Sequence, residues 1–305
     1  MKRATLALLR LRLWLGALAA LACVSSVSAA LAAEPAAVCP NGQPADGLLH
    51  VGNAANCLVM RLHAPADPMP GVLAVFMHGD NSGRTELRAN RGAAFNLADK
   101  LRLTTVALQR PGYVSELGKS DGYNRLQDDD YTPGNVRIVA AALAHLRQLH
   151  PDKKLLLIGH SGGSAMAALT AARFPDSADA FMVAACPCDV RTWREWRHAS
   201  AGRSAYWPHS LSPQAEAPKI LPGTRITLLV GSRDDNTLPK FSEAFVAQLQ
   251  TQGVQARLVL ADGATHSSVL QAPEFFALAL ELARQLAREL ARELAAPQPP
   301  RPPAE

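Results

Sequence analysis

The amino-acid sequence predicts an α/β fold in which a mostly parallel sheet is covered by helices on both faces. Short, continuous apolar runs alternate along the chain with longer stretches of helical character. Such runs are typical of strands that are buried on both faces of a parallel sheet. Ligands of these sheets bind beyond the carboxyl ends of the strands, so we expect the chemistry in the segments that directly follow the apolar runs.

The expected elements follow from this pattern in order. Alternating apolar residues at 48–50 and 57–63 predict an antiparallel pair of strands. Buried strands are expected at residues 71–77, 103–108, 155–158, 180–185, 226–230 and 256–260. Helices are expected at residues 85–101, 135–149, 164–174, 238–252 and 273–295. Right-handed crossovers between parallel strands then place helices on both faces of the sheet.

Length and composition exclude several classes of protein. The chain has 305 residues, of which 48% are hydrophobic and 19% are charged, so it can bury a sizeable core. This composition excludes wholesale disorder, a collagen-like repeat and a disulfide-dense mini-protein. One large domain is expected over residues 34–296, followed by a disordered, proline-rich tail over residues 297–305.

The first 33 residues have the pattern of a signal peptide. Lys2, Arg3, Arg10 and Arg12 precede an apolar run over residues 13–24 that is too short to span a bilayer, and small residues follow it. We therefore expect an exported protein, periplasmic or secreted, without a stable membrane span.

Two further expectations concern this N-terminal segment. No acidic residue precedes Glu34, so removal of the four basic residues reduces the net charge from +5 to 5 − 4 = +1. A nucleic-acid partner is therefore not expected. A lipid anchor on Cys23 is a less favoured alternative, because Leu21-Ala22-Cys23 loosely resembles a lipoprotein cleavage site.

Four cysteines follow the signal segment, and an oxidising compartment would allow them to pair. Cys39 and Cys57 are the favoured pair, and closing a loop of that size would stabilise the fold by about 3 kcal/mol. Cys186 and Cys188 are separated by Pro187, so a bridge between them is expected to be strained. One buried thiol and one exposed or pairable thiol are expected there.

A nucleophile is predicted at Ser161. The segment Gly159-His160-Ser161-Gly162-Gly163 follows an expected strand and precedes a helix of small residues, which is the context of a G-x-S-x-G nucleophile elbow. Glycines flank the serine because side chains there would collide with neighbouring elements in the strained turn.

A serine nucleophile needs a base and an acid that orients the base. His266 follows the last expected strand, and Asp234 and Asp235 follow the strand before it, which gives the order Ser, Asp, His expected for this fold. Separately, the aspartates could form a turn or cap a helix, and His266 could be an ordinary loop histidine. Asp234 is favoured as the acid, and Asp235 as a cap, but the sequence leaves this choice open.

The oxyanion of an acyl-transfer intermediate needs hydrogen-bond donors. One is expected from the backbone amide of Gly162 and a second from Gly79 or Asp80, which follow an early strand. His78 is expected to orient this loop rather than act as a base.

With these motifs, the chain resembles the α/β-hydrolase superfamily, nearest to its secreted dienelactone-hydrolase-like and prolyl-oligopeptidase-like branches. The resemblance covers about residues 70–290 and rests on His78-Gly79, Arg110-Pro111-Gly112-Tyr113, the Ser161 elbow, Asp234 and His266. It implies the α/β-hydrolase fold with a short cap, and a pocket bordered by the loop of Tyr113. The segment Cys186-Pro187-Cys188-Asp189 departs from the family pattern.

Residues 187–222 occupy the position of a cap insertion and contain Trp193, Trp196 and Trp207. An aromatic cap could close over a substrate and exclude water, or it could pack a small core of its own. The substrate-binding candidates are Tyr113, His160, Trp193 and Trp196.

The sequence therefore predicts an exported serine hydrolase that cleaves carboxylic esters through an acyl-enzyme. A serine peptidase on the same three residues is one alternative, and a non-catalytic binding protein on a hydrolase scaffold is another. The sequence shows no Glu pair for amine recognition, which favours the esterase, and the complete set of residues argues against the binding protein. No metal or cofactor motif is found. The expected partner is a small-molecule ester or a peptide.

Overall fold

A computed structural model describes residues 39, 48–80, 91–124, 130–202 and 209–296 of the chain. All of them belong to one compact unit, residues 36–305. The expected signal peptide and the proline-rich tail lie outside the described residues, as does Trp207.

The main sheet has eight strands in the order β1-β2-β4-β3-β7-β8-β9-β10. β2 pairs antiparallel with β1 and with β4, and every other neighbouring pair is parallel, which confirms the predicted mostly parallel sheet. The strands are β1 (Leu48–Asn53), β2 (Asn56–His63), β3 (Val72–Met77), β4 (Thr105–Leu108), β7 (Lys154–His160), β8 (Ala180–Ala184), β9 (Ile226–Gly231) and β10 (Ala256–Ala261).

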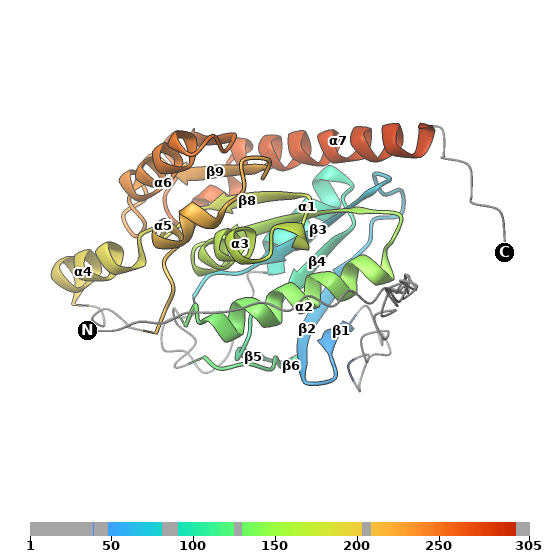
Figure 1. Ribbon diagram of the computed structural model, residues 1–305, viewed down its shortest axis with the longest axis horizontal. Coiled ribbons are helices and arrows are strands. Elements are labelled where there is room, and N and C mark those ends of the chain that lie inside the picture. The colour runs from blue at the N-terminus through green and yellow to red at the C-terminus, as the bar shows by residue number, and fades with distance from the viewer. Residues whose placement is uncertain (1–38, 40–47, 81–90, 125–129, 203–208, 297–305) are drawn as a thin grey trace, which may run out of the picture. The chain divides into compact units, whose positions relative to one another are not determined.

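Helices cover both faces of this sheet (Figure 1). One buried cluster joins a face of the sheet to α2, α3 and α6, and a second joins the opposite face to α1 and α7. The helices are α1 (Arg91–Leu101), α2 (Pro133–Leu149), α3 (Gly162–Arg173), α4 (Val190–Ala201), α5 (Pro213–Glu216), α6 (Pro239–Thr251) and α7 (Pro273–Ala295).

Strand β3 shows why the predicted strands are continuously apolar. Leu73, Val75 and Met77 belong to the cluster with α2 and α3, whereas Val72 and Phe76 belong to the cluster with α1 and α7. Successive side chains point to opposite faces of a sheet, so a strand covered on both faces needs apolar residues at every position.

The boundaries of the elements differ modestly from the predictions. The first part of the helix expected at 85–101 lies outside the described residues, and α3 begins at Gly162 rather than at Ser164. A small hairpin of β5 (Val114–Ser115) and β6 (Gly118–Lys119) was not predicted, because two-residue strands are too short to show an apolar period. The segment expected to be a cap contains α4 and α5. No helix in the described part of the chain is both long and apolar enough to cross a membrane.

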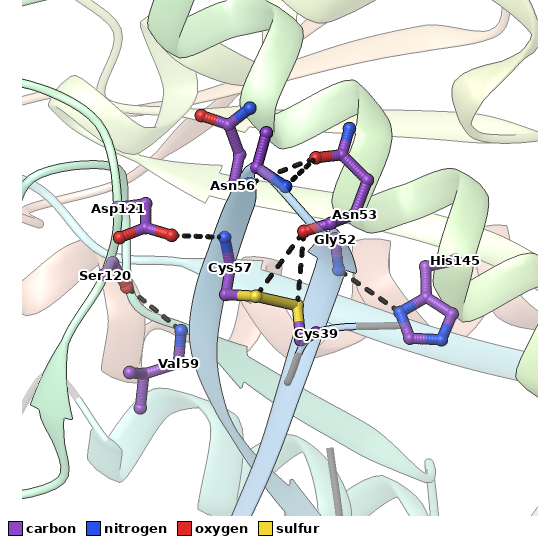
Figure 2. Close-up of a disulfide and its surroundings, with 10 residues drawn as sticks. Cys39, Gly52, Asn53, Asn56, Cys57, Val59, Ser120, Asp121 and His145 are labelled. Carbon is purple, nitrogen blue, oxygen red and sulfur yellow. Dashed lines mark hydrogen bonds between the residues drawn. A yellow bond between two sulfur atoms is a disulfide. The ribbon is translucent and has the colours of Figure 1, made fainter. Parts of the chain in front are cut away.

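Two disulfides are present in the described residues. Cys39 bonds to Cys57 beside the β1–β2 hairpin, as expected, and the nearby His145 of α2 accepts a hydrogen bond from the Gly52 amide (Figure 2). The imidazole of His145 thereby fixes the hairpin to α2.

The second disulfide corrects a prediction. Cys186 and Cys188 are bonded to each other and are both fully buried, so the expected unbonded thiols are wrong. Residues two apart in an extended strand are separated by about 6.6 Å. Here the chain turns after β8, with Ala185 at φ 51°, and the two cysteine Cα atoms lie 5.0 Å apart, a separation that a disulfide can span.

Candidate active site

Ser161 occupies the sharp turn between β7 and α3. Its backbone angles are φ 52° and ψ −123°, a strained conformation for a residue with a side chain. A Cβ on Gly159 would lie 2.6 Å from the Cα of Ser164, and a Cβ on Gly163 would collide with the carbonyl oxygens of Met77 and His78. The glycines of the elbow are therefore required by the close approach of β3, β7 and α3, as the sequence predicts.

The imidazole of His266 lies directly beside this serine. Its Nε2 atom is 2.9 Å from Ser161 Oγ, and its Nδ1 atom is 3.0 Å from Oδ2 of Asp234. The three residues are separated by up to 105 positions in the sequence and follow three different strands, β7, β9 and β10. The fold therefore brings together the nucleophile, base and acid candidates beyond the carboxyl ends of these parallel strands.

Asp234, rather than Asp235, contacts the histidine. The Asp234 carboxylate also accepts hydrogen bonds from the amides of Asn236 and Thr237, at 2.9 and 2.8 Å, and from the Thr237 hydroxyl at 2.9 Å. Burial alone would raise the pKa of Asp234, but the hydrogen bond and charge of His266 and the two amides lower it below its ordinary value. Asp234 is therefore held as a carboxylate.

Asp235 is exposed, and it does not cap the following helix as expected. The N-cap residue of α6 is Leu238, and no side chain makes a capping hydrogen bond there. The amides of the turn are instead bound by Asp234, which lies on the inner side of the loop.

Gly79 and Gly162, two of the predicted oxyanion donors, lie directly beside Ser161. A Cβ on Gly79 would lie 2.9 Å from the Cβ of Ser161. Gly162 is the first residue of α3, and its N–H has no hydrogen-bond acceptor among the described residues. Gly162, Gly79 and Asp80 remain the predicted oxyanion donors.

The side chain of Asp80 forms a buried cluster directly behind Gly162. Its carboxylate accepts hydrogen bonds from Arg110 Nη1 at 2.8 Å and from the Tyr131 hydroxyl at 2.7 Å. The side chains of Arg110 and Asp80 are only 2% and 7% exposed, and a Cβ on Gly162 would collide with Asp80 Oδ1. The ion pair leaves no uncompensated negative charge beside the predicted oxyanion site. We call Asp80, Arg110, Tyr113 and Tyr131 the Asp80 cluster.

The surroundings of Arg110 and Tyr131 determine the protonation states of these two side chains. Burial opposes the charged form of Arg110, but the electrostatic effects of Tyr113 and of the Asp80 carboxylate raise the pKa of its guanidinium above the ordinary value. Burial and the charge of Asp80 also raise the pKa of the Tyr131 phenol, so Tyr131 stays a donor. The sequence analysis noted Arg110 only as part of the Arg110-Pro111-Gly112-Tyr113 segment and did not single out Tyr131. Their contacts with Asp80 were missed because a buried ion pair has no short motif.

His78 orients the same loop, as expected. Its Nε2 accepts the Arg110 amide proton at 3.1 Å, so Nδ1 carries a proton that it donates to the Gly79 carbonyl at 2.7 Å. Burial, with a smaller effect of the Arg110 charge, lowers the pKa of His78 to about 3. His78 is therefore neutral at neutral pH.

The predicted substrate contacts need revision. Tyr113 is fully buried, with its ring edge on His78, so it has no surface for a substrate and instead supports the Asp80 cluster. His160 is 5% exposed, and its Nε2 contacts the His266 carbonyl oxygen, so direct substrate contact is also wrong in this arrangement. Both residues are buried, although the sequence predicts that they contact the substrate.

The two tryptophans of α4 contact Asn236, in the loop that follows Asp234, and Phe241 of α6. Trp193 is 6% exposed and donates its indole N–H to the Asn236 carbonyl at 2.9 Å. Trp196 is half-buried, with its ring edge on Phe241 at a centroid distance of 6.2 Å. Trp193 is therefore used in packing rather than in the predicted substrate contact, whereas contact of Trp196 with substrate stays a prediction.

Thr237 is a further residue that sequence reasoning missed. Its hydroxyl is 2.9 Å from Asp234 Oδ2 and 3.1 Å from His266 Nδ1, and its side chain is fully buried. A threonine three residues after an acid has many ordinary explanations, so only the geometry identifies it. No group of three potential metal ligands is found within the described ranges.

A nucleophile elbow on this sheet defines a serine hydrolase of the α/β-hydrolase superfamily. Comparison with family profiles is more specific: the profile of the prolyl oligopeptidase family matches residues 126–284, which is half of the chain. The chain belongs to that family. The comparison with curated proteins gives no match.

Solved structures with the same fold include peptidases and esterases. Acylaminoacyl peptidase of Pyrococcus horikoshii has 14% identity and a TM-score of 0.58 over 77% of this chain, but the alignment spans only 40% of that enzyme. Proline iminopeptidase of Mycobacterium smegmatis has 15% identity and a TM-score of 0.57, covering 79% of this chain and 99% of its own. A Pyrococcus furiosus esterase has 16% identity and a TM-score of 0.55, covering 85% and 98%.

Proposed function

We propose that the chain is an exported serine hydrolase that cleaves carboxylic esters through an acyl-enzyme. The observation that carries this proposal is the continuous hydrogen-bonded series from Ser161 Oγ through both nitrogens of His266 to Asp234, with distances of 2.9 and 3.0 Å. Both lengths are within the range for proton transfer between hydrogen-bonded groups.

The proposed reaction follows from these contacts. His266 Nε2 takes the proton of Ser161 as Oγ attacks the ester carbonyl, while Asp234 stabilises the imidazolium and fixes its tautomer. The amide of Gly162 and an amide of the Gly79–Asp80 loop hold the oxyanion. His266 then returns the proton to the leaving alcohol, and water hydrolyses the acyl-enzyme by the same steps in reverse.

The Asp80 cluster favours an ester over a peptide. Recognition of a peptide's amino terminus calls for an unpaired carboxylate near the nucleophile. In the part of the chain that the structure describes, Asp80 is a carboxylate that lies against Gly162, and it is already bound by Arg110 and Tyr131.

A peptidase is the second candidate, and membership of the prolyl oligopeptidase family is the observation that favours it. Steady-state assays on matched pairs of p-nitrophenyl esters and amino-acyl p-nitroanilides separate the two. We expect kcat/KM for the esters to exceed that for the anilides by more than the intrinsic difference in reactivity of the two bonds. Efficient hydrolysis of the anilides would support the peptidase instead.

Export is a separate part of the proposal and has its own test. The N-terminal pattern of four basic residues, an apolar run and small residues supports cleavage around residues 29–33. We expect intact-mass and N-terminal peptide analysis of the secreted or periplasmic fraction to begin in this range. A mature chain that begins with an acylated Cys23 would support the lipid anchor, and an uncleaved chain would contradict export by this signal.

A further inference from the structure

His160, the residue directly before the nucleophile, also contacts the base. It ends β7, the residue is 5% exposed, and its Nε2 lies 2.8 Å from the main-chain carbonyl oxygen of His266. The centroids of the two imidazole rings are 5.0 Å apart. This contact joins two segments that are 106 residues apart in the sequence.

The hydrogen-bonding partners of His160 define its tautomer. A carbonyl oxygen only accepts, so the proton of His160 lies on Nε2. The Nδ1 atom is buried and has no partner among the described residues, and it faces the side of Gly79, where an added Cβ would lie 3.4 Å away. His160 is therefore a neutral imidazole whose Nε2–H donates a hydrogen bond to the main-chain carbonyl oxygen of His266.

The environment of His160 maintains this neutral state. Burial, with a smaller effect of the nearby His266 charge, lowers the pKa of His160 to about 4. The titratable groups near it include His78, His266, Asp234 and Asp80, and the effects of both carboxylates are weaker than that of burial. At neutral pH His160 neither competes with His266 for the Ser161 proton nor places a positive charge beside the imidazolium that forms in the reaction.

We infer that His160 is a positioning residue that fixes the base against the nucleophile. This inference rests on the proposed function of Ser161 and His266. Residue 160 is linked to Ser161 by a peptide bond and to the His266 main chain by a hydrogen bond, so one side chain sets the separation of the two loops. Asp234 and Thr237 fix the other end of the base, at Nδ1.

The inference predicts a loss of rate rather than of substrate affinity. Displacement of a reacting group by about 1 Å costs on the order of 100-fold in rate. We expect His160→Phe, which keeps a ring of similar size but has no donor, to lower kcat about 10- to 100-fold with KM changed less than about threefold. His160→Gln can place an amide N–H near the position of Nε2, so we expect it to recover at least about half of the loss on a logarithmic scale.

His145→Phe is the matched control. His145 is also a buried histidine with a single hydrogen bond across the fold, to the Gly52 amide at 3.2 Å, but it lies beside the β1–β2 hairpin (Figure 2). We expect His145→Phe to lower the unfolding midpoint while kcat per folded molecule stays within about twofold of wild type. Steady-state kinetics and urea unfolding of all four proteins make the comparison.

The outcomes distinguish the inference from the proposed function. If His160→Phe keeps kcat within twofold of wild type, or if the Phe and Gln variants are equally impaired, the positioning role is wrong. A kcat loss of the same size in His145→Phe would also overturn it, because the effect would then be one of general stability. A wild-type chain that hydrolyses neither esters nor amides and does not react at Ser161 would contradict the proposed function itself.

Discussion

The carboxylate of Asp234 receives more hydrogen bonds than a turn former needs. Two amides, one hydroxyl and the His266 ring surround it, and its side chain has no exposed surface. The hydrogen bonds compensate for the loss of water around the carboxylate, which is why burial does not protonate it. Asp235, one residue later, is exposed. Within the described residues, the carboxylate that contacts His266 Nδ1 is that of Asp234.

Asparagine substitutions at these two positions test the assignment. We expect Asp234→Asn to lower kcat by about 10³- to 10⁴-fold, because the amide can stabilise the wrong tautomer of His266 and cannot stabilise its charge. We expect Asp235→Asn to stay within about twofold of wild type. Ester hydrolysis under saturating substrate measures both, and similar mild effects of the two substitutions would remove Asp234 from its proposed role.

At the scale of elements, the Asp80 cluster connects the loops that follow β3 and β4 with Tyr131, which lies two residues before α2. The strand ends place these side chains close together, but their hydrogen bonds fix the loop that is proposed to hold the oxyanion. Loss of one bond should therefore affect both stability and rate.

The substitution Tyr131→Phe removes only the hydroxyl that donates to Asp80. We expect it to lower the free energy of unfolding by about 1 to 3 kcal/mol, since a buried carboxylate loses a donor, and to lower kcat with little change in KM. Urea unfolding and kinetics on a matched ester and thionoester pair make the test. A variant with reduced stability but an unchanged ester-to-thionoester rate ratio would show that the cluster supports the fold and does not position the oxyanion loop.

The elements were largely predictable from sequence, and the side-chain contacts between them were not. Apolar runs predicted the main strands because both faces of the sheet are covered, and the turn glycines together with the order of Ser161, Asp234 and His266 predicted where those residues meet. In contrast, Tyr113, His160 and Trp193 were assigned to the substrate from their positions in loops or a cap. Their burial depends on packing between segments distant in sequence, for which a single chain carries no local signal.

At the scale of the whole molecule, the hairpin disulfide should contribute to stability and not to chemistry. Cys39 and Cys57 are 18 positions apart in the sequence. The chain-entropy model gives a stabilisation of about 3 kcal/mol for a disulfide that closes a loop of this size. We expect the Cys39→Ser, Cys57→Ser double variant to unfold at lower urea concentration, with kcat unchanged where it is folded. An unchanged unfolding midpoint would contradict this contribution.

Buried neutral histidines make the fold sensitive to acid. The pKa is lowered to about 3 for His78 and to about 4 for His160, against 6.5 for the ordinary side chain. Between pH 6.5 and 4 these two side chains therefore bind up to two more protons in the unfolded chain than in the folded chain, so the stability that they contribute above pH 6.5 is lost as the pH falls. The slope is at most about 1.4 kcal/mol per pH unit for each histidine.

Urea unfolding at pH 7.5 and pH 5 measures this dependence. We expect a lower free energy of unfolding at pH 5, and a smaller difference between the two pH values in His160→Gln, which removes one of the two histidines. Equal pH dependence in wild type and variant would mean that His160 takes up its proton in the folded state as readily as in the unfolded state.

The most direct test of the proposed chemistry is covalent labelling with a fluorophosphonate, followed by peptide mass spectrometry. Proton transfer to His266 should make one serine reactive among all the serines of the folded chain. We predict that wild type is labelled at Ser161, that His266→Ala is labelled far more slowly, and that Ser161→Ala is not labelled. Labelling at another serine, or a folded wild-type chain that hydrolyses esters without reacting at Ser161, would contradict the account.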